Sequence, residues 1–251
     1  MNIIFLGRKK YAAELIEWTI QRKINIIAIC TDKQCENEEI IKKAKEHSIP
    51  LLSIEEIESY ILEHPQEIEL VISYLHIHKL SSVFFEIPKF GCINFHPAIL
   101  PNWRGTAGYN MAILNKLSEW GATAHYVNNE IDMGPIIRVH RFSFDYRLET
   151  ASSLERKTQL IQMDLYKSVI LDVELYGKLK CTEQKREEGK YVSRKQMNDL
   201  KLLDINRMDN EEIDLMIRAF WFPPYSGAGI IHNGKHYSLI NEEILRKIER
   251  D

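Results

Sequence analysis

The chain has 251 residues, which at roughly 150 residues per domain allows one or two domains with a full hydrophobic core. Hydrophobic residues make up 45% of the sequence and charged residues 27%, which excludes a disordered or fibrous chain. The formal net charge of −3 argues against a protein that binds nucleic-acid backbones over a broad surface. The apolar runs are shorter than the ~18 residues of a membrane helix, and the apolar start lacks a basic lead-in, so we expect a cytoplasmic protein without membrane insertion.

The cysteines indicate neither a metal site nor a disulfide framework. The four residues are Cys30, Cys35, Cys92 and Cys181. They form no Cys-x-x-Cys pair, and no histidine lies near them at zinc-ligand spacing. We therefore predict reduced, buried thiols and no bound metal.

Three apolar runs in the first third of the chain alternate with amphipathic segments. The runs lie at 2–6, 25–30 and 68–74, and helical spacing covers 11–22 and 37–47. Short β-rich runs that alternate with helices are typical of βαβ units, whose parallel strands are buried on both faces. The pattern predicts a Rossmann-like, doubly wound α/β domain with a mostly parallel sheet.

The elements that follow complete this domain. In chain order we expect a strand at 92–94, a loop, a helix at 109–117, strands at 122–127 and 136–144, and a long helix at 149–176. Pro97 and Pro101 exclude regular structure from the loop after the first of these strands. Thr150 or Ser152 is expected to cap the long helix.

The character of the sequence changes after Gly177. Residues 183–190 are charged and contain no core residue, which predicts a boundary between a main domain at 1–177 and a small appendage at 178–251. In the appendage we expect a helix near 209–219, a Pro-Pro turn and a β-hairpin. The hairpin prediction depends on Asn233 and Gly234, since Asn-Gly between two β-rich runs favours a type I′ turn.

Two polar residues end the fourth predicted strand. Ligands bind at the carboxyl ends of strands in open parallel sheets, and Asn94 and His96, two residues apart, project to the same side there. Asp132, in a second loop, is able to accept a hydrogen bond from His96 and fix its tautomer. Taken separately, these side chains also fit local roles, as partners of nearby backbone groups or as a turn residue. Gly7 stands alone after the first strand, so the sequence does not predict a bound dinucleotide.

Three segments in combination resemble the formyltransferase family that uses N10-formyltetrahydrofolate. They are residues 94–105, 121–127 and 131–137, and the resemblance extends over about residues 1–175. It implies N10-formyltetrahydrofolate as the cofactor and Asn94, His96 and Asp132 as the catalytic residues. An amine that attacks the formyl carbon generates a tetrahedral oxyanion, to which Asn94 or His96 is able to donate a hydrogen bond. His96 is alternatively the acceptor of the amine proton, with Asp132 holding its ring.

The resemblance also implies where the folate binds, between the segment after the third strand and the second loop. The implied residues are Tyr74, His76, Ile77, His78, Val127, Asn128 and Ile131. The family recognises the pterin largely through backbone groups, so the side chains carry little information. For His76 and His78, an ordinary surface position is an equally good interpretation.

The acceptor amine is not determined by the core. Within the family, acceptors include glycinamide ribonucleotide, methionyl-tRNA and nucleotide-linked amino sugars. The appendage has 14 basic and 13 acidic residues and is too short for a full oligonucleotide-binding barrel, so we expect no nucleic-acid partner. Residues 109–110 and 218–228 resemble the sugar enzymes, which implies dTDP-4-amino-4,6-dideoxyglucose as the acceptor, for O-antigen or other surface polysaccharide synthesis. A methionyl-tRNA formyltransferase, a formyltetrahydrofolate hydrolase and a binding module without turnover stay open as alternatives.

Aromatic and basic residues of the loop and the appendage are candidates for acceptor binding. They are Trp103, Arg104, Gly105, Tyr109, Arg194, Lys195, Arg218, Phe222 and Tyr225. The aromatic rings offer faces for a pyrimidine and the basic side chains offer charge for a pyrophosphate, although aromatic residues here also fit the core of the appendage. We further expect a homodimer, because an exposed hairpin leaves unpaired strand edges that a second copy can cover.

Overall fold

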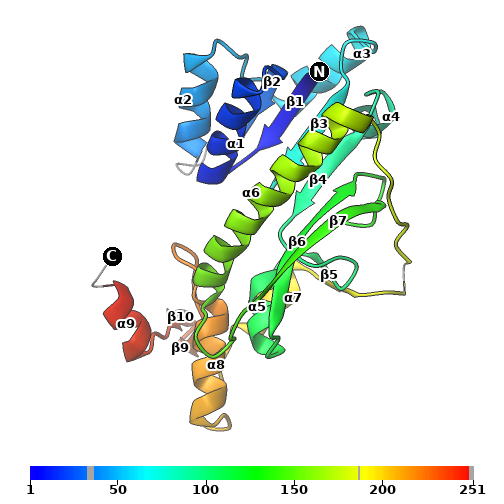
Figure 1. Cartoon of the computed structure of the whole chain (residues 1–251). Helices are drawn as coiled ribbons and strands as arrows, with labels where there is room; N and C mark the ends of the chain where they lie inside the picture. The colour runs from blue at the N-terminus through cyan, green and yellow to red at the C-terminus, as the bar shows by residue number, and fades with distance from the viewer. Residues whose placement is uncertain (33–36, 186, 249–251) are drawn as a thin grey trace.

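The computed structural model describes residues 1–32, 37–185 and 187–248, and a six-stranded sheet forms its centre (Figure 1). The sheet has the order β2-β1-β3-β4-β6-β7. Its strands are β1 (Asn2–Gly7), β2 (Asn25–Cys30), β3 (Leu70–Tyr74), β4 (Cys92–His96), β6 (Glu119–Tyr126) and β7 (Ile136–Ser143). Strands β1 to β4 are mutually parallel, whereas β6 pairs in antiparallel orientation with both of its neighbours, β4 and β7. The predicted doubly wound, mostly parallel α/β sheet is confirmed.

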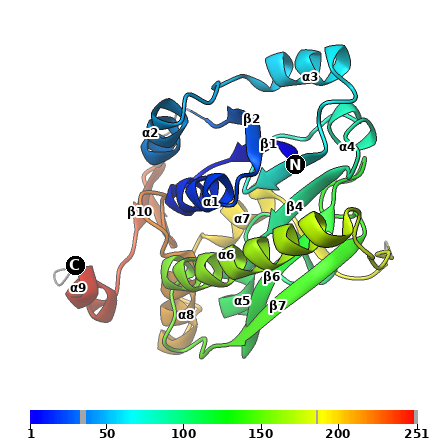
Figure 2. The same cartoon turned by 45° about the horizontal axis from the view of Figure 1, so that its top comes forward.

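Helices cover both faces of the sheet (Figure 2). On one face lie α1 (Lys10–Gln21), α2 (Glu38–Glu46) and α6 (Ala151–Tyr176), and on the other lie α3 (Ile54–Glu63) and α4 (Val83–Glu86). Alternate residues of β1 point to opposite sides, so Phe5 packs with Tyr166 of α6 while Leu6 packs with Phe84 of α4. This double burial explains why the strands are continuous apolar runs.

The long helix α6 connects the sheet to the region of the predicted site. Thr150 caps it, with a side chain that accepts from the Ser153 N–H, so one of the two predicted caps is confirmed. Two buried glutamines interrupt its apolar stripe. Gln159 accepts a hydrogen bond from the Tyr74 hydroxyl (3.0 Å), and Gln162 donates to the Phe95 carbonyl (2.6 Å). These contacts hold α6 against the ends of β3 and β4.

Helix α3 is absent from the predicted elements, although the sequence carries a local signal for it. Ser53 accepts from the Glu56 N–H, and the Glu56 carboxylate accepts from the Ser53 N–H. This capping box, Ser-x-x-Glu before an apolar run, marks a helix start.

The appendage is built from short elements. They are β8 (Lys190–Val192), α7 (Arg194–Leu200), α8 (Asn210–Phe220), β9 (Gly229–His232), β10 (Lys235–Ser238) and α9 (Glu242–Ile248). Phe220 of α8 joins a third apolar cluster with Trp120 of β6 and Ala112 of α5 (Gly108–Leu114). Asn233 and Gly234 have φ angles of +48° and +75°, as the predicted type I′ turn requires.

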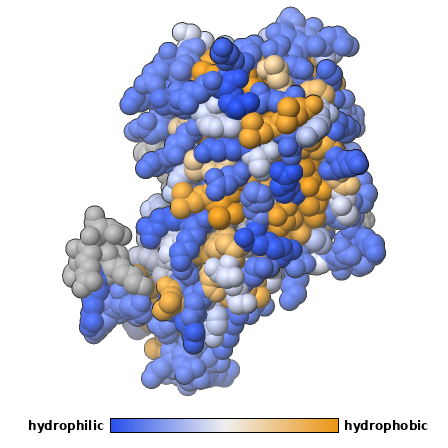
Figure 3. All heavy atoms as spheres, viewed as in Figure 1, coloured by the Kyte–Doolittle hydropathy of each residue, from blue (hydrophilic) through white to orange (hydrophobic). Residues whose placement is uncertain are grey.

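The surface differs between the two parts. In the view of Figure 3, apolar residues gather in the middle of the face, whereas the lower part, where Figure 1 draws α8, is mainly hydrophilic. Among the residues that the structure describes, no helix combines the length and apolar character required to cross a bilayer. Cys30 and Cys92 are buried, as expected. Cys181 is exposed, so the expectation of a buried thiol is wrong for this residue. Cys35 lies outside the described residues.

Candidate active site

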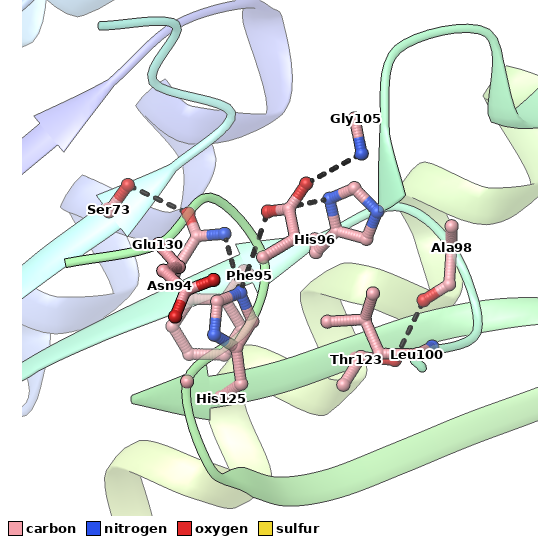
Figure 4. A network of polar contacts seen from close by, with 12 residues as sticks. Ser73, Asn94, Phe95, His96, Ala98, Leu100, Gly105, Thr123, His125 and Glu130 are labelled. Atoms are coloured by element: carbon pink, nitrogen blue, oxygen red, sulfur yellow. Dashed lines mark hydrogen bonds and ion pairs between the residues drawn. The ribbon is translucent and has the colours of Figure 1, made fainter. Parts of the chain in front are cut away.

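The sheet register and one turn bring the three predicted catalytic residues together. Asn94 and His96 lie at the carboxyl end of β4 (Figure 4). Asp132 lies in the turn between β6 and β7. His96 Nδ1 is 3.4 Å from Asp132 Oδ1. The His96 side chain is only 8% exposed and that of Asp132 only 11%, so their interaction is shielded from bulk water.

The amide of Asn94 is fixed by two neighbours. The Ser73 hydroxyl of β3 donates to Asn94 Oδ1 (2.8 Å), and Asn94 Nδ2 lies 3.0 Å from His125 Nε2 of β6. His125 is opposite Asn94 in the antiparallel register of β4 and β6. One hydrogen of the Asn94 Nδ2 group is not used by these contacts, so the amide retains a donor of defined direction.

The tautomer of His125 follows from its second contact. His125 Nδ1 lies 2.8 Å from the Tyr126 carbonyl, which only accepts, so Nδ1 carries the proton and Nε2 accepts from Asn94. Burial lowers the pKa of His125 to about 4, although the nearby Asp132 opposes this effect, and the ring is therefore neutral near pH 7. In the sequence, His125 stands out only as part of the family segment 121–127, with no sign that it belongs to the site. Its role depends on strand pairing, which the sequence does not display.

Asp132 is held in an unusual backbone conformation. Its φ is +55°, and its Oδ2 accepts a hydrogen bond from the Gly105 N–H (2.8 Å). The turn is tight: a Cβ on Gly134 would lie 1.7 Å from the Tyr126 carbonyl oxygen, so only glycine fits there. Gly134 is therefore required by the turn itself, whatever the chemistry of the neighbouring Asp132.

The loop after β4 supports the histidine through its backbone. His96 Nε2 donates to the Trp103 carbonyl at the start of β5 (Trp103–Gly105) at 3.0 Å, because that oxygen only accepts. Both ring nitrogens of His96 thus face protein oxygens, on Trp103 and Asp132. The arrangement offers an oxyanion donor in Asn94 and a proton-holding pair in His96 and Asp132, which suits transfer of an acyl group to an amine without a covalent enzyme intermediate.

The predicted folate residues occupy different environments. The Tyr74 side chain is fully buried between β3 and α6, where burial raises the pKa of its hydroxyl, so only the backbone of Tyr74 stays a candidate for the cofactor pocket. Ile77 and Ile131 are about half exposed, at 51% and 52%. The His76 Nε2 atom is buried without a partner among the described residues, and burial together with His78 lowers the pKa of His76 to about 4.

The other two predicted folate residues lie at the second loop. Val127 packs against the apolar cluster that contains Leu80 and Phe84. The Asn128 side chain accepts from the Glu130 N–H (2.9 Å) and so shapes the start of the turn. Both residues stay candidates for the cofactor pocket.

Arg218 is not placed as expected. It lies in α8 with 7% of its surface exposed, its Nε donates to Asp214 (2.7 Å) and its Nη1 donates to the Tyr146 carbonyl. A guanidinium committed to partners inside the protein is not available to a phosphate. The expected phosphate contact of Arg218 is corrected to a structural role that links α8 to the start of α6.

The remaining acceptor candidates divide into two groups. Tyr109 and Phe222 lie together, with ring centroids 6.4 Å apart and planes only 14° from parallel, and Lys9 Nζ is 5.2 Å from the Phe222 centroid. Tyr225 is next to Phe222 and 56% exposed. Arg194 and Lys195 are exposed on α7, whereas Arg104 Nη2 donates to the Glu188 carbonyl (2.7 Å).

The fold places this cluster of polar side chains at the carboxyl edge of an open α/β sheet, which is where such folds bind ligands. The sequence profile of the formyl transferase family matches residues 1–170. The chain belongs to the formyl transferase family, which confirms the resemblance noted in the sequence.

Relatives with curated names extend over most of the chain. A methionyl-tRNA formyltransferase of Thermotoga sp. (strain RQ2) is 26% identical over 234 residues, which cover 88% of this chain and 72% of that protein. A methionyl-tRNA formyltransferase of Geotalea daltonii is 27% identical over 248 residues, which cover 94% of this chain and 77% of that protein.

Solved structures share the fold over nearly the whole chain. A 4-N formyltransferase from Francisella tularensis superposes with a TM-score of 0.79 at 21% identity, covering 95% of this chain and 96% of that one. WlaRD, a sugar 3N-formyltransferase solved in the presence of dTDP and 5-N-formyl-THF, superposes with a TM-score of 0.74 at 23% identity. The match covers 94% of this chain and 84% of that one. The similarity includes the appendage as well as the sheet domain.

Proposed function

We propose that this protein transfers the formyl group of N10-formyltetrahydrofolate to the amine of a nucleotide-linked amino sugar. The observation that carries the proposal is the Asn94 amide, fixed by Ser73 and His125 beside the His96–Asp132 pair. This is the donor-plus-base arrangement that formyl transfer requires. The match of the formyl transferase profile supports the reaction type.

The residues at the carboxyl end of β3 fit a folate. A pterin is a flat ring with a polar edge, and Ile77 and Ile131 present exposed apolar side chains that suit its faces. The unpartnered, buried Nε2 of His76 suits its polar edge. The cofactor supplies an activated formyl carbon, and the chain binds and orients it through this segment and the loop that contains Val127 and Asn128.

In the transfer step, the residues of this chain have separate tasks. Asn94 donates its unused amide hydrogen to the oxygen on which charge develops. The His96–Asp132 pair takes the proton that the attacking amine releases. Trp103 and Gly105 hold this pair through backbone contacts. His125 stays neutral and keeps Asn94 oriented, since its own proton is bound to the Tyr126 carbonyl.

The appendage supports a sugar nucleotide as the acceptor. The chain covers 96% of the Francisella 4-N formyltransferase but only 72% of the Thermotoga methionyl-tRNA enzyme. Phe222, Tyr225 and Tyr109 provide aromatic faces for a pyrimidine, and Arg194 and Lys195 provide charge for a pyrophosphate. We propose dTDP-4-amino-4,6-dideoxyglucose as the substrate, for O-antigen or another surface polysaccharide.

A methionyl-tRNA formyltransferase is the second candidate, favoured by the names of the curated relatives. The near-neutral appendage argues against it, because RNA binding at physiological salt depends on clustered basic residues. A formyltetrahydrofolate hydrolase would use the same residues with water as acceptor.

Product analysis by mass spectrometry distinguishes these candidates. The protein is incubated with N10-formyltetrahydrofolate and dTDP-4-amino-4,6-dideoxyglucose, with charged methionyl-tRNA, or without acceptor. We expect a formylated sugar nucleotide and little free formate. Formylated methionyl-tRNA alone would establish the second candidate, and formate release independent of any acceptor would establish a hydrolase.

We also propose that the enzyme is a cytoplasmic homodimer with the appendage near the interface. Ile231 and Tyr237 of the hairpin are 57% and 45% exposed on opposite faces of the ribbon, which leaves apolar side chains for a second copy to cover. A monomer in light scattering at micromolar concentration would contradict this assembly.

A further inference from the structure

The charged segment after α6 does not leave the sheet domain directly. In Figure 1 it is drawn in yellow, runs down beside β6 and β7, and returns beneath them to α7. We call residues 182–185 and 187–192 the clamp segment. Both loops that hold the catalytic residues contact it, although its side chains gave no signal of a core in the sequence.

The first part of the clamp segment holds the Asp132 turn. Thr182 and Ile136 exchange two backbone hydrogen bonds of 2.8 Å each. Gln184 Nε2 then donates to the carbonyls of Asp132 (3.0 Å) and Gly134 (2.7 Å). Both acceptors are carbonyl oxygens, so the orientation of the Gln184 amide is fixed and both of its hydrogens are used.

The second part holds the loop after β4. β8 pairs in parallel with β5, and the Lys190 N–H donates to the Asn102 carbonyl (2.8 Å). Gly189 has φ +80°, and a Cβ there would lie 1.7 Å from the Pro101 carbonyl oxygen. The backbone of the clamp segment is therefore in direct contact with the loop, with no room for a side chain between them.

These two attachments meet at the catalytic pair. In the loop after β4, the Gly105 N–H donates to Asp132 Oδ2 and the Trp103 carbonyl accepts from His96 Nε2. Asp132 has a φ of +55°, which is unfavourable for a residue with a Cβ and persists only where surrounding contacts enforce it. Gln184 supplies such contacts on both sides of Met133, at the Asp132 and Gly134 carbonyls.

We propose that Gln184 is a positioning residue that sets the Asp132 carboxylate against His96 and Gly105, so that the clamp segment completes the active site. The proposal rests on the proposed function for its catalytic consequence, but the structural contact that it predicts is measurable without any substrate. A displacement of about 1 Å in a catalytic group costs as much as a hundredfold in rate.

The test compares Gln184→Met and Gln184→Glu, which keep the length of the side chain and remove the amide donor. Steady-state kinetics should show kcat lowered about 10- to 100-fold with both KM values within about twofold. The amide hydrogen of Gly105, followed by NMR, should exchange about tenfold faster or more, because its acceptor Asp132 Oδ2 is displaced. Gln21→Met is the matched control, since Gln21 is exposed on α1 and bonded only to Glu17 among the described residues.

Unchanged kcat and unchanged Gly105 exchange in a folded Gln184 variant would overturn the proposal. Faster amide hydrogen exchange throughout the protein, together with a lowered melting temperature, would show that Gln184 has only a general structural role. That result would also overturn the proposal. If the wild-type protein formylates none of the acceptors, the proposed function fails, whereas Gly105 exchange still decides whether Gln184 positions Asp132. Gln184→Glu serves alone if Gln184→Met does not fold.

Discussion

The sheet domain and the appendage hold their functional residues in different ways. Every residue of β3 is buried and β4 is nearly so, whereas β9 and β10 of the appendage are mostly exposed. In the sheet, strand register alone places Asn94 beside Ser73 and His125. In the appendage, positions depend on docking onto other elements, as where Phe222 packs on Tyr109. The geometry of the proposed catalytic residues is thus fixed by the fold, while the proposed acceptor contacts depend on a smaller and more exposed unit.

The largest expected effect is at the proposed catalytic residues. His96→Asn or Asp132→Asn should lower kcat by about two to four powers of ten, the range for loss of a general base or of its support, with the fold retained. Steady-state formyl transfer measures this, and Asp164→Asn, at an exposed position on α6, is the control. Turnover close to wild type in either variant would remove these residues from the mechanism.

The second prediction tests whether the two parts unfold together. Phe220 is 2% exposed in the cluster shared with Trp120, so Phe220→Ala should lower the free energy of unfolding by about 3–5 kcal/mol. Tyr225→Ala, at a side chain that is 56% exposed, should change it by less than about 0.5 kcal/mol. A denaturant titration with one transition for the whole chain would support unfolding of the two parts as a single unit. A separate transition of the appendage at a lower denaturant concentration would contradict such coupled unfolding.

The third prediction concerns acid. The pKa of His125 is about 4 in the folded protein, below its ordinary value of 6.5, so the unfolded chain binds more protons between these pH values. The free energy of unfolding should therefore fall as the pH falls from about 6.5 towards 4, by about 3 kcal/mol for this residue at the acid end. Denaturant melts at several pH values measure the slope, which His125→Gln should reduce. The exposed His64→Gln is the control, and an equal slope in both variants would show that His125 is not responsible.

The fourth prediction addresses the appendage as the source of acceptor contacts. Loss of a charged hydrogen bond to phosphate costs about 1.5–3 kcal/mol, so Arg194→Ala or Lys195→Ala should raise the acceptor KM about tenfold and leave the folate KM unchanged. Arg207→Ala, at a side chain that is 87% exposed in the same appendage, should have little effect. Equal KM values in all three variants would exclude α7 from the acceptor site.

The smallest effect is expected at Ser73. Ser73→Ala removes the hydroxyl that donates to Asn94 Oδ1, so the Asn94 amide is held less firmly. We expect this to raise the activation free energy by about 1.4 kcal/mol, which corresponds to a tenfold lower kcat. The control is Ser168→Ala, whose hydroxyl donates within α6 to the Leu165 carbonyl. If Ser73→Ala retains full kcat, His125 alone is sufficient to orient Asn94.

The sequence alone determined the alternation of strands and helices and the Asn233-Gly234 turn, because these depend on local periodicity and turn chemistry. Its motifs also pointed to Asn94, His96 and Asp132 as the proposed catalytic residues. Only the tertiary structure decided which residues surround them. His125 reaches Asn94 through antiparallel pairing, and Gln184 reaches Asp132 across 52 residues of chain. Arg218 was expected at a phosphate and lies buried instead, since a basic residue in a sequence does not reveal whether an acidic or carbonyl partner has already bound it. Such contacts join residues distant in the chain, and hydrophobic pattern and propensity encode the elements but not these pairings.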